Sequence, residues 1–224
     1  MNSNGKIVMS FEEGKHTVNV SISKGKGSFE QAFDVSSDVI TGLFNKDWST
    51  GYFSVSQDGP IYLETRGDLT LVVAQRASRQ NQTIRWGRGE NPEVLSVTTP
   101  WAVGLFILKK NPEGHYHLRD SWLYTTTGPA LGAYTQLKSA HWMGNVYNDD
   151  RICWGTTQVN RTTAVAISSV TNFINEFFLE TFTPDIATSN RLWTEFTESG
   201  TNPGPSIGSL SSTIARIWRN ELGR

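Results

Sequence analysis

Alternating apolar and polar positions in the first part of the chain predict short β-strands. Two such segments, residues 7–11 and 18–22, flank a Glu-Glu-Gly-Lys turn. Turn sequences separate later segments of the same kind, and Gln57-Asp58-Gly59-Pro60 is typical of a hairpin. These later strands are predicted at residues 52–55, 61–65, 69–74, 83–86, 94–97, 101–108 and 116–124. Because consecutive strands joined by short turns tend to pair, the pattern predicts an antiparallel meander.

The spacing of apolar residues becomes helical in the last third of the chain. Residues 162–181, 189–199 and 211–222 each carry apolar side chains on one face. Ser37 predicts the N-cap of a further short helix that reaches about Phe44. The last helix is expected to turn four side chains inward, which are Ile214, Ile217, Trp218 and Leu222. Strands first and helices last predict an α+β protein with a β-rich N-terminal extension.

An irregular segment, residues 125–161, lies between the strands and the helices. Gly128-Pro129 and Gly132 interrupt regular structure there, yet the segment is rich in aromatic and aliphatic side chains. A long ordered segment without regular structure is often a functional one. The sequence therefore indicates that a site lies in this segment.

Composition and charge exclude several classes of protein. The 224-residue chain has 20 basic and 21 acidic residues, and this balance argues against binding to nucleic acid through its phosphates. No run of about 18 apolar residues occurs, so no membrane association through a spanning helix is expected. The N-terminus lacks the apolar core of a signal peptide, and the single cysteine, Cys153, cannot form an internal disulfide. We therefore expect a cytoplasmic protein.

The residues around that cysteine form a distinctive motif. Asn145, Val146 and Tyr147 are followed, after a short polar turn, by Ile152 and Cys153. This stretch resembles the active site of ubiquitin-conjugating enzymes. In that family His-Pro-Asn is followed by Val or Ile, often Tyr, then a polar turn, and then Ile or Val before the catalytic Cys. The Asn and the Cys are eight positions apart in the common form of the motif, and they are eight apart here.

The chain departs from the family motif at three points. Met143-Gly144 stand where the family has His-Pro, and Asp150 stands where the family has a turn glycine. His141 lies two positions before the family's histidine. The context of the motif is similar to that of the family, because a strand meander precedes it and helices follow it.

Most of the chain is also similar to a divergent bacterial ubiquitin-conjugating-like group that includes protein B of the plasmid-borne PRTRC system. A strand that starts at Pro100 leads to an Asn-Val-Tyr…Cys-x-Gly signature, which ends here at Gly155. The resemblance implies an N-terminal extension, a ubiquitin-conjugating-like core and C-terminal helices packed on the core, over residues 1–47, 48–181 and 182–224. It also implies a role in a bacterial plasmid-maintenance or antiphage-defence system.

The resemblance implies the chemistry of a carrier thiol. Cys153 would accept the C-terminus of a ubiquitin-like protein as a thioester and pass it to an amine. The implied partners are an activating enzyme, the modifier and a protein substrate, and no metal or other cofactor is implied. Asn145 holds the position of the family's asparagine, which donates a hydrogen bond to the oxyanion or makes the loop rigid. Asp149 and Asp150 are the nearest carboxylates that could orient or deprotonate the amine.

The residues leave three other hypotheses open. A catalytically inactive scaffold or binding subunit of the same fold would account for the missing His-Pro and turn glycine. A cysteine hydrolase would pair Cys153 with His141 or His117 as its base. A binding module would use tryptophans exposed as a cluster, chosen from Trp48, Trp86, Trp101 and Trp122.

Overall fold

The computed structural model shows an α+β protein, as the order of predicted strands and helices indicates. It describes residues 6–11, 17–23, 29–36, 50–52, 58–88, 90–130, 132–154, 164–183 and 190–222. The short helix predicted from Ser37, together with Trp48 and Gln57, lies outside the described residues.

Three strands near the N-terminus form their own antiparallel sheet, in the order β1-β2-β3. β1 (Lys6–Phe11) and β2 (Thr17–Ser23) are the two strands that the alternation predicts, and they pair with each other. β3 (Phe29–Ser36) is missing from the prediction, because a Gly/Lys loop before it and the N-cap signal of Ser37 after it indicate a loop that leads to a helix. The predicted β-rich character of the N-terminal extension is confirmed.

Seven strands form the main sheet, in the order β13-β11-β10-β9-β6-β5-β4, and each neighbouring pair is antiparallel. The strands predicted from residue 61 to 74 and from 101 to 124 belong to this sheet. The seven strands of the sheet are β4 Thr50–Tyr52, β5 Gly59–Arg66, β6 Leu69–Arg76, β9 Trp101–Lys110, β10 Tyr116–Thr126, β11 Gln136–Ser139 and β13 Ser206–Ser209.

The chain departs from a simple meander between β6 and β9. β6 pairs with β9, whereas β7 (Arg79–Trp86) and β8 (Glu93–Thr99) form a second sheet with β12 (Thr181–Phe182). The pairing runs from Arg76 opposite Ala102 in the main sheet to Arg79 opposite Thr99 in the second. The four strands are therefore two arms of one long, bent hairpin. Pro100 lies at the bend, where a residue without an N–H interrupts the ladder.

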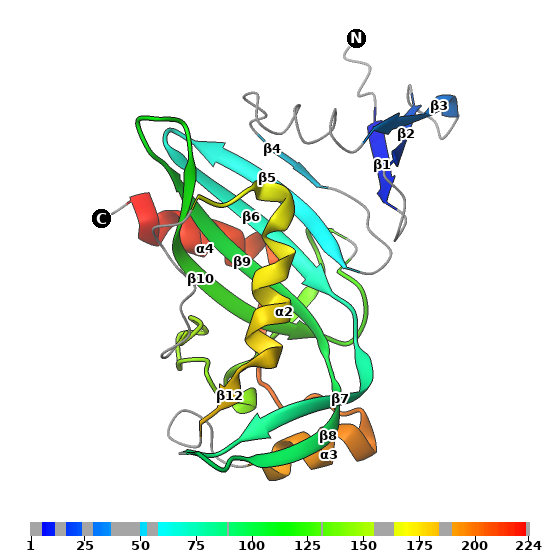
Figure 1. The fold of residues 1–224 in the computed structure, drawn as a ribbon. Coiled ribbons are helices and arrows are strands. Elements are labelled where there is room, and N and C mark those ends of the chain that lie inside the picture. The colour runs from blue at the N-terminus through cyan, green and yellow to red at the C-terminus, as the bar shows by residue number, and fades with distance from the viewer. Residues whose placement is uncertain are drawn as a thin grey trace.

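Helices cover both faces of the main sheet. α2 (Thr171–Leu179) lies across one face and α4 (Leu210–Leu222) across the other (Figure 1). Adjacent residues of β9 alternate between the two cores, since Phe106 packs under α2 while Leu105 and Ile107 pack under α4. This burial on both faces explains the continuous apolar run of β9. α3 (Arg191–Ser199) packs against β8 and ends at Gly200, as predicted.

The helix predicted for residues 162–181 begins later than expected. Its regular part starts at Thr171, after a 3₁₀ turn over Ile167–Ser169. The N–H of Val165 donates instead to the carbonyl of Tyr116 at 2.8 Å. β-Branched residues such as Val165 favour the extended backbone that such pairing needs.

The last helix is confirmed with one correction to its buried face. Ile214, Ile217 and Trp218 are buried as predicted, whereas Leu222 is 58% exposed at the end of α4. Leu222 follows the last turn that reaches the sheet, so the helical period alone could not exclude it. Among the described residues, no helix is long and apolar enough to cross a membrane.

Candidate active site

The residues around the cysteine form a tight β-hairpin, residues 145–153, which we call the site hairpin. Val146 and Ile152 face each other as a β-bridge. The N–H of Cys153 donates to the carbonyl of Asn145 at 2.7 Å, which closes the base of the hairpin. Asn145 and Cys153, predicted to act together, are therefore directly paired through their backbones.

The tip of the site hairpin is a turn that ends in a left-handed residue. The N–H of Asp150 donates to the carbonyl of Tyr147 at 2.9 Å, and the N–H of Tyr147 donates to the carbonyl of Arg151 at 2.9 Å. Asp150 has a φ of 64°, a conformation that glycine adopts freely and that aspartate tolerates. A turn followed by such a residue is a common hairpin connection. The position where the resemblance expects glycine is thus one where the backbone favours glycine.

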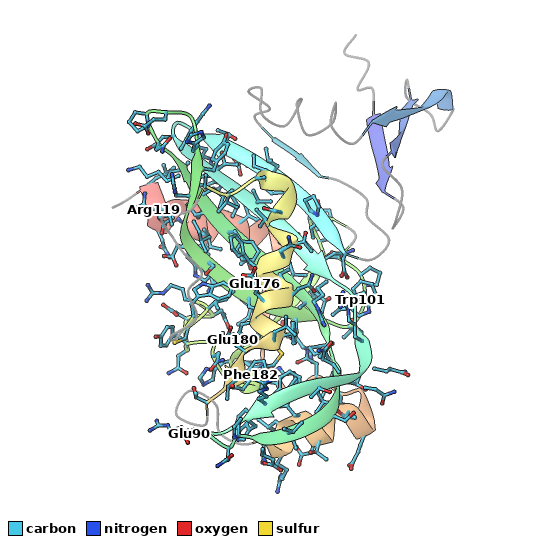
Figure 2. The ribbon with its side chains drawn as sticks, viewed as in Figure 1. Glu90, Trp101, Arg119, Glu176, Glu180 and Phe182 are labelled. Atoms are coloured by element: carbon cyan, nitrogen blue, oxygen red, sulfur yellow. The ribbon has the colours of Figure 1, made fainter. Side chains whose placement is uncertain are left out.

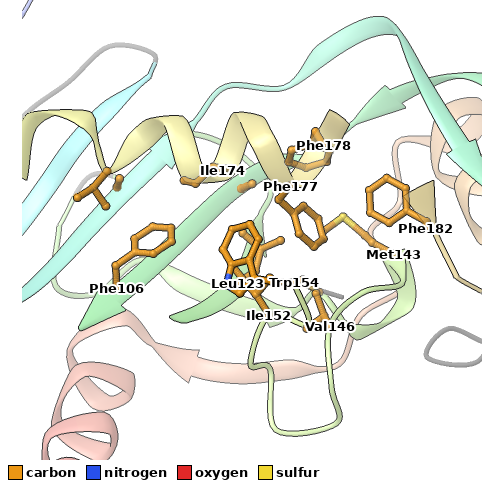
Figure 3. Close-up of a cluster of buried hydrophobic side chains, with 14 of the residues drawn as sticks. Phe106, Leu123, Met143, Val146, Ile152, Trp154, Ile174, Phe177, Phe178 and Phe182 are labelled. Carbon is orange, nitrogen blue, oxygen red and sulfur yellow. The ribbon is translucent and has the colours of Figure 1, made fainter. Parts of the chain in front are cut away.

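The returning arm of the site hairpin is anchored on β10. The N–H of Ile152 donates to the carbonyl of Ser121 at 3.0 Å, and the indole N–H of Trp154 donates to Oγ of Ser121 at 3.0 Å. Ile152 and Trp154 are buried in the cluster between α2 and the sheet (Figure 3). Side chains alternate along an extended chain, so Cys153 between them faces away from this core.

The sulfur of Cys153 has a hydroxyl beside it. Cys153 is a partly exposed free cysteine, and the hydroxyl of Tyr147 donates a hydrogen bond to its Sγ at 3.1 Å. The Tyr147 side chain is itself 47% exposed. The hydrogen bond to Cys153 is the main cause that raises the pKa of Tyr147 above its ordinary value of 10.0. A reactive thiol belongs to an accessible cysteine in a polar environment. Cys153 is partly exposed and has a hydroxyl beside its sulfur.

The side chain of Asn145 is buried against β12. Its Nδ2 donates to the carbonyl of Thr181 at 3.0 Å, and its Oδ1 accepts from the N–H of Thr183 at 3.2 Å and from the Thr183 hydroxyl at 3.1 Å. The amide thus pairs with β12 as the backbone of a neighbouring strand would. Of the two roles that the resemblance implies for Asn145, this geometry corresponds to making the loop rigid.

The two predicted carboxylates lie in different environments. Asp149 is exposed and pairs with Arg151, with 2.7 Å between Oδ2 and Nε. Asp150 is buried and accepts a hydrogen bond from the hydroxyl of Ser139 at 2.5 Å. Burial raises the pKa of Asp150 above its ordinary value of 3.8, against the opposing effects of the Ser139 hydrogen bond and the charge of Arg216. Both carboxylates line a cavity of about 200 Å³ between the tip and α4, and Asp149 is the one open to solvent.

The histidines of the hydrolase hypothesis have other partners. Nδ1 of His141 lies 2.7 Å from the carbonyl oxygen of Val146, and Nε2 of His117 lies 3.1 Å from Nδ2 of Asn111. In the part of the chain that the structure describes, neither ring is hydrogen-bonded to Cys153. The same residues contain no group of three or more His, Cys, Asp or Glu that could hold a metal ion.

The tryptophans of the binding-module hypothesis belong mainly to the interior. Trp86 and Trp122 are buried, and Trp101 is half-buried on β9 (Figure 2). Trp48 lies outside the described residues. The described tryptophans thus form no exposed cluster of the kind that this hypothesis requires.

Sequence reasoning included Tyr147 only as a matching position of the motif. The strand pairing indicates why Tyr147 contacts the sulfur. Tyr147 follows Val146 and Cys153 follows Ile152, and Val146 and Ile152 form the β-bridge. Tyr147 and Cys153 therefore lie on the face opposite that pair.

Comparison with protein-family models, with curated proteins and with solved structures finds no match to this chain.

Proposed function

We propose that this protein carries a ubiquitin-like modifier as a thioester on Cys153 and transfers it to an amine of a protein substrate. One observation carries the proposal: a partly exposed cysteine lies on a β-anchored hairpin, pairs through its backbone with Asn145 and accepts a hydrogen bond from a hydroxyl at its sulfur. The arrangement of the chain supports it, because antiparallel strands precede the site hairpin and α2 follows it and packs on the sheet (Figure 1).

The reaction has two balanced steps. The Cys153 thiolate first attacks the thioester carbonyl on the activating enzyme, and the thiolate of that enzyme leaves. The amine of the substrate then attacks the carbonyl carbon on Cys153, the carbon–sulfur bond breaks, and an amide forms. The amine gives up its proton to solvent or to an accessible carboxylate, for which Asp149 is the best placed of the two aspartates.

The proposed setting follows from the resemblance. The three partners are an activating enzyme that supplies the modifier, the ubiquitin-like modifier and a protein with a reactive amine. We place this set in the bacterial cytoplasm, in a plasmid-maintenance or antiphage-defence system whose other members are encoded nearby. No cofactor takes part on this chain.

The test is to charge the purified protein with its activating enzyme, ATP and modifier. We expect an adduct with the mass of one modifier that a reducing thiol releases, and that the Cys153→Ala variant does not form. The Tyr134→Phe variant, which changes an exposed side chain on another loop, serves as a matched control and charges like the wild type. If the activating enzyme forms its own thioester but passes none to Cys153, the proposal is wrong.

A catalytically inactive scaffold of the same fold is the second candidate. The observation that favours it is the engagement of the Asn145 amide with β12, which leaves this amide without a role at the sulfur. The charging experiment separates the two candidates. A scaffold binds the modifier or the activating enzyme without a covalent adduct, and its binding is unaffected by Cys153→Ala.

A further inference from the structure

The hydrogen-bond donors of the site hairpin differ from those that the resemblance implies. The amide of Asn145 donates to Thr181 on β12. Among the described residues, the side-chain donor on the sulfur of Cys153 is the hydroxyl of Tyr147, at 3.1 Å. A donor in this position can stabilise a thiolate, and it can also reach an oxygen on an acyl carbon bonded to the same sulfur, because that oxygen is only two bonds from the sulfur.

We propose that Tyr147 is a catalytic residue whose hydroxyl donates a hydrogen bond to the acyl oxygen during transfer and to the leaving thiolate of Cys153. This inference rests on the proposed function and adds a residue to it. When the amine attacks, the carbonyl electron pair moves onto oxygen, and the Tyr147 O–H stabilises the oxyanion. When the intermediate collapses, the carbon–sulfur bond breaks and its electron pair stays on sulfur, where the same O–H donates again.

The backbone around Tyr147 suits this role. Its N–H and its carbonyl are both held inside the turn, by Arg151 and Asp150 respectively. The backbone position is thereby fixed, and the side chain is 47% exposed, so the hydroxyl beside the sulfur lies on a side chain that solvent and a substrate can reach. Because the hydrogen bond to Cys153 raises the pKa of Tyr147 above 10.0, the phenol remains protonated and a donor at neutral pH.

The charged groups near the pair have each other as partners. In the described part of the chain, Arg151 and Asp149 are charged neighbours of Tyr147, and Arg151 is bonded to Asp149 through its Nε. Both remain unchanged when Tyr147 is replaced by phenylalanine. A change in transfer rate in that variant therefore reports the hydroxyl.

The experiment uses the chemistry of the site without the biological partners. Cys153 is the only cysteine of the chain, so phenyl thioacetate converts it alone into an S-acetyl thioester. Mass spectrometry then follows the loss of the acetyl group to glycinamide or hydroxylamine at neutral pH. The full-length protein, Tyr147→Phe and the matched control Tyr134→Phe are compared, and thermal unfolding verifies that both variants fold.

We expect Tyr147→Phe to slow aminolysis on the order of 10-fold, less than the loss seen when a donor is removed from a fully enclosed oxyanion site. Tyr134→Phe should keep the wild-type rate. A rate for Tyr147→Phe equal to that of the control overturns the inference. This readout is separate from charging by the activating enzyme. The proposed function can therefore fail while Tyr147→Phe still slows acyl transfer, and the reverse can also be seen.

Discussion

Asp150 shows at the scale of one residue how the chain departs from its family resemblance without losing the turn. Its φ of 64° lies in the left-handed region that glycine adopts freely. Its carboxyl group is buried and accepts a hydrogen bond from the hydroxyl of Ser139, a contact that glycine could not make. The sequence shows only that a glycine is missing, whereas the backbone angle shows why aspartate can replace it.

Replacing Asp150 by asparagine should stabilise the protein at neutral pH. Burial raises the pKa of Asp150 above 3.8, so the folded state favours the protonated carboxyl. The resulting stability is complete below the ordinary pKa and is lost as the pH rises through the raised value. Asparagine adopts the same φ, accepts the same hydrogen bond from Ser139 and has no charge to bury. We expect Asp150→Asn to raise the free energy of unfolding by up to about 1 kcal/mol at pH 7.

Urea unfolding of Asp150→Asn and wild type across the acidic range measures this effect. The difference between the two proteins should shrink as the pH falls toward and below 3.8, because the Asp150 carboxyl then becomes protonated in the folded and in the unfolded state. A loss of stability in Asp150→Asn at pH 7 would show that the attraction between Asp150 and Arg216 outweighs the cost of burial.

The contact between the site hairpin and β12 joins two elements that are far apart in sequence. Asn145 provides both a donor and an acceptor to the backbone of β12, which places the base of the hairpin beside the end of α2. The sequence predicts a short polar turn between Asn145 and Cys153 in a segment expected to be irregular, and the hairpin itself is seen only in the structure. The sequence does not predict the partner of the amide, since Thr181 and Thr183 lie 36 and 38 residues further along the chain.

Changing Asn145 to aspartate tests this contact with little change in shape. The carboxylate still accepts from Thr183 but cannot donate to the carbonyl of Thr181, which is left facing a negative oxygen. We expect the free energy of unfolding to fall by about 1–3 kcal/mol. Asn148→Asp, an exposed change in the same hairpin, should have little effect. Equal melting temperatures for the two variants would contradict a structural role for the Asn145 amide.

The elements that the sequence predicts well are those whose burial leaves a regular pattern. β6, β9 and β10 are long and apolar, and α4 has a clear helical face. β12 has only two residues, and β11 and β13 have four each, so their pairing depends on tertiary contacts rather than on pattern. The sequence pattern does not predict the bent hairpin from β6 to β9, because it favours pairing between strands that are consecutive in the chain, whereas β6 pairs with β9.

At the scale of the whole molecule, α4 buries the face of the main sheet that α2 does not cover, so the stability of the fold depends on its attachment. Its indole at Trp218 donates to Oε2 of Glu64 on β5 at 2.6 Å, and Tyr62 donates to the same oxygen at 2.7 Å. Arg66 bonds to Oε1 of Glu64 and also stacks over the Trp218 ring. A second link lies near the end of α4, where Arg119 of β10, labelled in Figure 2, pairs with the buried Glu221, with 3.2 Å between Nε and Oε2. Charged groups thus fix the last helix on the sheet.

Glu64→Gln should weaken this attachment in a pH-dependent way. Burial alone would raise the pKa of Glu64, but hydrogen bonds from Tyr62, Arg66 and Trp218 and the charge of Arg66 lower it below its ordinary value of 4.5. The stability from the carboxylate is therefore present above pH 4.5 and lost as the pH falls through the lowered value. We expect Glu64→Gln to lower the free energy of unfolding by about 1–3 kcal/mol at pH 7.

The contribution of Glu64 to the free energy of unfolding changes with pH in the opposite direction to that of Asp150. The effect of Glu64→Gln is therefore best measured in protein that already carries Asp150→Asn. In Asp150→Asn protein, urea unfolding from about pH 7 to about pH 3 should show the penalty of Glu64→Gln fading as the carboxylate is protonated. Glu113→Gln, an exposed change in the turn after β9, is the matched control. A penalty that stays constant over this range would mean that Glu64 holds α4 by its shape and not by its charge.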